Sequence, residues 1–150
     1  MDRRYIIDNE HELDRLRKLV NTITDEELDL TLHEEGWTIA VALAHVAFWD
    51  RHRLSLVRKW KQEGVKSSPF DENIINDALI PFFLEIKPRK AAEMSITTAE
   101  KLDQELTNLS PELISAIEAL GDRHALNRSI HRKMHLDDID TFLIEQRKMK

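Results

Sequence analysis

The stretch RSIHRKMHLDDI, residues 128–139, places two of the chain's seven histidines, His131 and His135, four positions apart. On a helix this spacing brings the two Cβ atoms to about 5–6 Å and turns the side chains about 40° from one another. Both imidazoles can then reach one metal ion while each ring keeps its second nitrogen for another partner. The pair is therefore a candidate metal-binding motif.

The residues around this pair predict which way it faces. Apolar residues flank the histidines at helical spacing, among them Ile139 and Met134, whereas Lys133, Asp137 and Asp140 fall on the opposite side. We expect both histidines to point into the core and the charged residues to face solvent.

A third ligand decides between a metal site and two hydrogen-bonded histidines at the edge of a core. His45, within VALAHVAFWD, has apolar neighbours at helical spacing and is also expected to point inward. Three neutral nitrogen ligands with a vacant fourth position are typical of a catalytic metal centre, because structural sites usually have four protein ligands. The remaining histidines lie among charged residues and are expected to be solvated: His11, His33, His52 and His124.

Helical signals run along most of the chain. Capping residues and apolar periodicity predict helices at 9–22, from Thr38 to Gly64, from Asp71, from about Lys90 to 106, from Ser110 to Leu120, and at 126–146. A short capped turn follows Thr24, the segment around Pro69 is the clearest loop, and Pro81 and Pro88 predict a kink or break between them.

Composition fits one helical domain spanning residues 1–150. The chain has 33% charged and 41% apolar residues but only three glycines and four prolines, which favours long helices over many short strands. A net charge of −6 disfavours nucleic-acid binding, and the absence of cysteine excludes thiolate ligands and a protein-borne thiol nucleophile. Because no apolar run reaches membrane-spanning length and the first residues do not resemble a secretory signal, we expect a cytoplasmic protein that does not bind membranes.

Two segments carry a family resemblance. The run WTIAVALAHVAFWDRHRL, followed far downstream by RSIHRKMHLDDI, resembles the DinB-like superfamily, which includes the metal-binding domain of mycothiol-dependent maleylpyruvate isomerases. The resemblance implies an up-down-down-up four-helix bundle, often a homodimer, in which His45, His131 and His135 occupy the positions of the metal triad. It also implies a divalent metal and, in some members, thiol-dependent transfer or isomerisation with a small thiol such as mycothiol or bacillithiol.

Several alternatives stay open. The expected activity is S-transfer to, or isomerisation of, a small electrophile with zinc or nickel; the alternatives are a hydrolase that uses metal-bound hydroxide and a non-enzymatic metal-binding or stress-related dimer. Phe48, Trp49 and Phe142 are candidate pocket walls or plain core, and neither Asp50 nor Asp138 receives a role. An added apolar stripe on the second helix gives modest support for dimerisation but can equally pack within the chain: Leu43, Leu54 and Val57.

Overall fold

The computed structural model describes residues 2–33 and 36–150. Within these residues the chain forms helices and no strand, apart from an isolated bridge between Thr31 and Thr38. The helices are α1 (Arg4–Thr22), α2 (Asp25–Leu28), α3 (Ile39–Glu63), α4 (Glu72–Leu84), α5 (Pro88–Thr107), α6 (Pro111–Ala119) and α7 (Ser129–Lys148). The predicted all-α class is confirmed.

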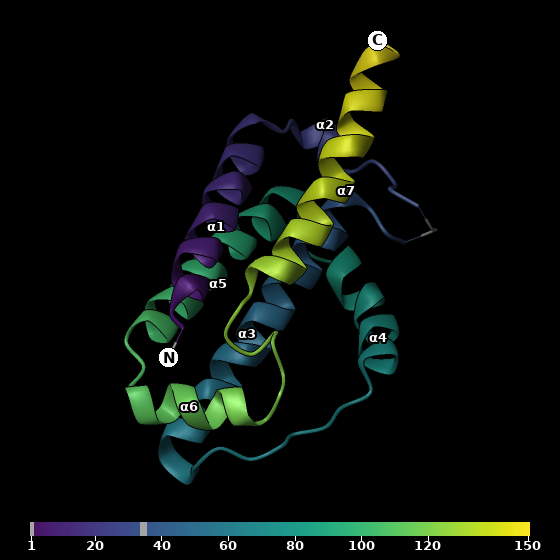
Figure 1. Ribbon diagram of the computed structural model, residues 1–150. Helices are drawn as coiled ribbons and strands as arrows, with labels where there is room; N and C mark the ends of the chain where they lie inside the picture. Colours follow the sequence, from purple (N-terminus) through teal and green to yellow (C-terminus); the bar gives the residue numbers. More distant parts are fainter. Residues whose placement is uncertain (1, 34–35) are drawn as a thin grey trace.

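The four long helices α1, α3, α5 and α7 form a bundle (Figure 1). Helix α3 packs against α5 and α7, and α1 packs against the same two helices from the other side. In the view of Figure 1, α1 and α7 run upward along the chain while α3 and α5 run downward. Helix α4 lies outside this group against α3, and α6 crosses the lower end.

The predicted capping residues hold the helix ends. Thr38 accepts a hydrogen bond from the backbone N–H of Val41 at 3.0 Å, and Gly64 ends α3 with a φ of 91°, a conformation that glycine adopts without strain. Thr24 and Glu27 form a reciprocal capping box at the start of α2. These local signals were sufficient to predict both ends of α3 from the sequence.

The starts of two predicted helices differ from the structure. Helix α1 begins at Arg4, five residues before the predicted start, and its added turn is anchored by buried Tyr5, whose hydroxyl donates to the carbonyl of Leu106 at 3.1 Å. Helix α7 begins at Ser129 rather than at residue 126. The predicted break between Pro81 and Pro88 is confirmed at residues 85–87: Pro81 lies inside α4, and Pro88 opens α5 at a position where no donor is needed.

Helix α3 is the central helix of the bundle. Every residue from Ile39 to Ala47 is buried, which matches a sequence that is apolar on all sides. The stripe of Leu43, Leu54 and Val57 is covered by the chain itself, at 0–1% exposure. It therefore packs within the bundle and offers no exposed surface for a second copy.

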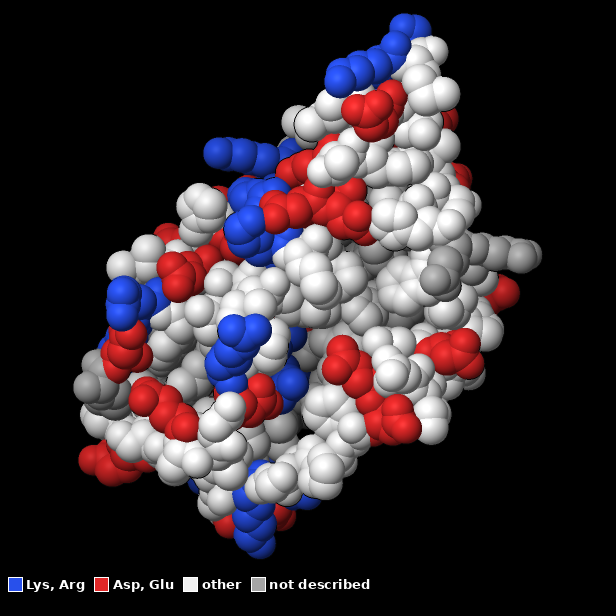
Figure 2. Space-filling view, turned by 45° about the vertical axis from the view of Figure 1, so that its right-hand side comes forward, with Lys and Arg blue, Asp and Glu red and all other residues white. Residues whose placement is uncertain are grey.

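The surface mixes both signs of charge. On the face in Figure 2, acidic and basic side chains alternate, and no broad basic area is visible among the residues coloured there. None of the described helices combines the length and the apolar character needed to cross a membrane.

Candidate metal centre

Three imidazoles from two helices meet beside the core. His45 lies in the first half of α3, and His131 and His135 lie one turn apart in the first half of α7. The Nε2 atom of His131 is 3.1 Å from the Nε2 atom of His45 and 3.1 Å from that of His135. The predicted convergence is confirmed, and the three residues are called the histidine triad below.

Burial keeps the triad neutral. It lowers the pKa of His45 to about 3 and the pKa of His135 to about 4, from an ordinary value near 6.5. Burial also lowers the pKa of His131, and repulsion from a positive charge on His135 would lower it further. All three rings are therefore unprotonated at neutral pH, which is the form that can bind a metal.

The donor set fits a divalent metal ion. One ligand nitrogen from each ring lies within 4.8 Å of the others. Bonds of about 2.0–2.1 Å in a tetrahedral site place ligand nitrogens about 3.3 Å apart, close to the two short separations found here. A single N–H on His131 Nε2 can satisfy only one of its two neighbours, whereas one cation satisfies all three nitrogens.

The triad is less central than the sequence predicted. His45 is buried at 4% exposure, but His131 and His135 are only partly buried, and Met134, placed on the core side by the sequence pattern, is 59% exposed. The side of α7 that enters the core instead carries Arg132 and Leu136. The register error is small, because the histidine pair still faces α3, but it left the two fully buried arginines unnoticed.

Asn9 of α1 fixes the first turn of α7. Its side-chain oxygen accepts hydrogen bonds from the backbone N–H groups of Arg128 at 2.8 Å and Ser129 at 2.9 Å. Its amide donates to the carbonyl of Leu126 at 2.9 Å. A residue 120 positions away thus caps the helix that carries two members of the triad.

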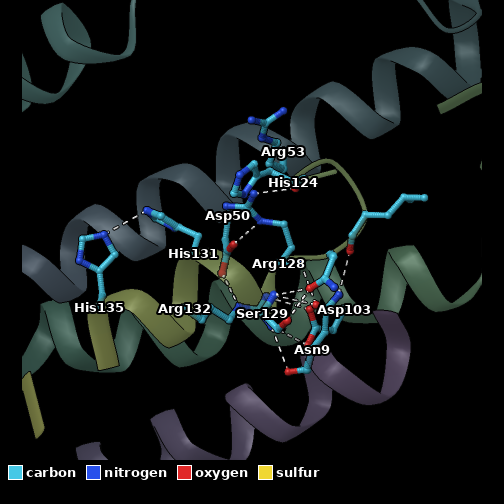
Figure 3. A network of polar contacts seen from close by, with 12 residues as sticks. Asn9, Asp50, Arg53, Asp103, His124, Arg128, Ser129, His131, Arg132 and His135 are labelled. Atoms are coloured by element: carbon cyan, nitrogen blue, oxygen red, sulfur yellow. Dashed lines mark hydrogen bonds and ion pairs between the residues drawn. The ribbon is translucent and has the colours of Figure 1, made fainter. Parts of the chain in front are cut away.

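A buried ionic layer joins α3, α5 and α7 (Figure 3). Asp50 accepts from Arg128 Nε at 2.9 Å and from Arg132 Nε at 3.1 Å, and Arg132 also makes two hydrogen bonds to Asp103. Asp50 and Arg132 are 0% exposed and Arg128 is 2% exposed. Because Arg128, at the N-cap of α7, and Arg132, within α7, each lie three residues before a histidine of the triad, this layer fixes the rotation of α7 that turns His131 towards His45.

The sequence contained a signal for this layer. Arg128 and Arg132 have the same four-residue spacing as the histidine pair, and Asp50 interrupts an otherwise apolar stretch of α3. Sequence reasoning left Asp50 without a role, and the structure places it in the core as the partner of both arginines.

A small pocket adjoins the triad at His131. It has a volume of about 160 Å³ and lies between α3, the start of α4 and the start of α7. Trp49 and Phe70 form an aromatic wall with ring centroids 5.1 Å apart, and Arg53 and Arg128 also line the pocket. Trp49 is thus a wall residue, as one reading of the sequence proposed, whereas Phe48 and Phe142 pack against the core.

The other histidines divide into two groups. His11 and His33 have exposed side chains, as predicted. His52 was predicted to be solvated, but it is partly buried, and burial lowers its pKa. Its ring centroid lies 5.2 Å from that of Trp49 and 5.0 Å from that of Phe70. His124 is also partly buried, and burial lowers its pKa as well.

Asp138 makes its hydrogen bond to His33 and none to the triad among the described residues. Its carboxylate lies 2.6 Å from Nε2 of His33 at the surface, and its charge raises the pKa of His135 against the larger effect of burial. Trp37 packs edge-on against the ring of His45, with the ring centroids 5.2 Å apart.

The fold and the site together define a helical bundle with three histidines positioned to bind a metal ion. The sequence model of the DinB superfamily matches residues 9–143, and the chain belongs to this superfamily. Comparisons with curated proteins and with solved structures found no match.

Proposed function

We propose that this DinB-superfamily protein is a metal-dependent enzyme that acts on a small electrophile. It would either transfer a small thiol to the electrophile or use the thiol to isomerise it. The observation that carries the proposal is the convergence of three neutral imidazole nitrogens beside a pocket of small-molecule size. His45, His131 and His135 would hold the divalent ion, with zinc or nickel as the proposed metal because imidazole suits both.

A bound divalent ion would supply Lewis acidity and lower the pKa of a thiol or water at its vacant position. The chain itself keeps the three ligands unprotonated by burial and holds their helices in register through Asp50 and Asn9. Trp37 packs edge-on against the ring of His45 and restricts its orientation. Because the chain has no cysteine, the attacking sulfur must come from a separate thiol.

The test is a thiol-consumption assay on untagged, zinc- or nickel-loaded protein with bacillithiol or mycothiol and a set of small electrophiles. We expect turnover that needs both the metal and the thiol and that is lost in His131→Gln. His33→Gln, a variant of an exposed histidine outside the triad, should leave turnover unchanged. Turnover without thiol would identify a hydrolase instead, and metal binding without turnover would identify a binding protein.

We also propose a homodimer, as the family resemblance implies. Large apolar side chains on α4 are exposed, with Ile74 at 66% and Phe82 at 70%, and pairing of two copies would cover them. Sedimentation at micromolar concentration tests this, and a monomer would reject it.

A further inference from the structure

The pocket beside His131 contains a buried guanidinium that the protein satisfies only in part. Arg128 donates from Nε to Asp50 and from Nη1 to the carbonyl of His124, at 2.9 and 2.8 Å. Among the described residues its Nη2 group has no hydrogen-bond partner, although the side chain is 2% exposed and lines the pocket. This nitrogen is the free donor of the guanidinium at the pocket, and a charged donor without a protein partner can take an acceptor from outside the chain.

The charge balance of the ionic layer supports the same reading. Asp50 is shared between two arginines, and among residues 2–33 and 36–150 only Arg132 has a second carboxylate, that of Asp103. Arg128 therefore shares its one carboxylate partner with Arg132, and burial lowers the pKa of Arg128. An added anion at Nη2 would complete its neutralisation without disturbing the contacts to α3.

Arg53 adds a second cation to the same pocket. Figure 3 shows its side chain close to those of His124 and Arg128. It pairs with Asp122 through Nη1 at 2.9 Å, while its buried Nε has no partner among the described residues. The pocket thus has two guanidinium groups, each with donor capacity left over.

Apolar side chains form much of the remaining lining, beside Glu72, His124 and His131. Trp49 and Phe70 offer aromatic surfaces, and Met134 and Ile130 lie across from them on α7. The volume of about 160 Å³ is close to the roughly 150 Å³ of a protein cavity that holds one benzene molecule. One six-membered ring or an equally short chain fits this space.

We infer that this pocket binds a small organic carboxylate, with the carboxylate at Arg128 and Arg53 and the apolar body against Trp49 and Phe70. The inference rests on the proposed function in one respect: the carboxylate in this pocket would be the electrophilic substrate, held beside His131. Binding itself requires no metal. Glu72, exposed at the rim, opposes an anion and should weaken binding slightly.

The test is calorimetric titration of metal-free full-length protein with benzoate, with benzamide as the uncharged molecule of the same shape. We expect one benzoate per chain and at least tenfold weaker binding of benzamide. Arg128→Gln should weaken benzoate at least tenfold, because it removes a charge-assisted donor while Asp50 keeps Arg132 as its partner. Arg51→Gln makes the same charge change at an exposed neighbouring position and should have no effect.

Two further variants keep the test decisive if Arg128→Gln fails to fold. Glu72→Gln should tighten benzoate about twofold, and Phe70→Leu should weaken it several-fold. Equal binding of benzoate and benzamide, or no change in either variant, would overturn the inference. Inorganic phosphate that binds as tightly as benzoate, with no effect of Phe70→Leu, would identify a bare anion site and also overturn it. Because no metal is present, the outcome is independent of whether the triad holds an ion.

Discussion

Breaking the buried ionic layer around Asp50 should lower the stability of the fold by several kcal/mol. Replacing Asp50 by Asn removes the only carboxylate of the described residues that pairs with Arg128 and leaves a guanidinium of 2% exposure without that counter-charge. The Asn amide would also present N–H groups to one of the two arginine Nε donors. Breaking a buried pair in this way costs about 3–5 kcal/mol, a large part of the roughly 5–15 kcal/mol that stabilises an ordinary domain.

The assay is urea unfolding at pH 7, with the free energy of unfolding extrapolated to water. The matched control is Asp14→Asn, which removes the same charge from a surface pair with Arg17 whose side chains are 57% and 38% exposed. Exposed pairs contribute about 0–1 kcal/mol, so the control should lose no more than that. The double variant Asp50→Asn, Arg128→Gln should be more stable than the sum of the single losses by at least about 1 kcal/mol.

A loss below about 1 kcal/mol for Asp50→Asn, or a loss equal to that of Asp14→Asn, would refute this reasoning. It would mean that solvent reaches Arg128 in solution and that the layer does not fix the rotation of α7. Strict additivity in the double variant would show that the charge on Arg128 is not the source of the cost.

Three other perturbations have defined outcomes. In EDTA, lowering the pH from 7 to 5 should lower the free energy of unfolding by about 2 kcal/mol per triad histidine. Below pH 6.5 these histidines bind protons in the unfolded chain, whereas in the folded chain His135 binds a proton only near pH 4 and His45 only near pH 3. Equal unfolding free energies at both pH values would contradict this. Asn9→Ala should cost about 2–3 kcal/mol in urea unfolding, because it leaves backbone groups at the start of α7 unpaired, and an unchanged midpoint would argue against the cap. Thr24→Ala should lower the unfolding free energy by about 1 kcal/mol through loss of the capping box, whereas Thr22→Ala, at the exposed end of α1, serves as its control.

Local sequence signals predicted the helices well because their ends carry strong caps. Thr38 and Gly64 defined α3, and Ser110 with Pro111 defined α6. Apolar periodicity around His45 placed that residue inward, and the structure buries it at 4% exposure. These features depend on residues within a turn or two, which is the range over which sequence patterns are informative.

The missed features depend on contacts across the chain. Charged residues usually lie at the surface, so a pattern-based reading places Arg132 outside, and only its contacts with Asp50 and Asp103 explain why it is buried. Locally, Asn127 accepts from the backbone N–H of Ser129, but the partner of the Arg128 N–H is Asn9, and no local rule finds a partner more than 100 residues away. His52 was placed in solvent because of its arginine neighbours, whereas a distant loop residue, Phe70, covers it.

Metal binding by single-histidine variants tests the central claim most directly. Untagged protein would be stripped with EDTA, titrated with zinc or nickel, and compared with His45→Gln, His131→Gln and His135→Gln, with His11→Gln as an exposed control. We expect one ion per chain in the unchanged protein and in the control, and at least a hundredfold loss of affinity in each triad variant. One tightly bound ion per chain in all three triad variants would contradict a shared metal centre at these residues.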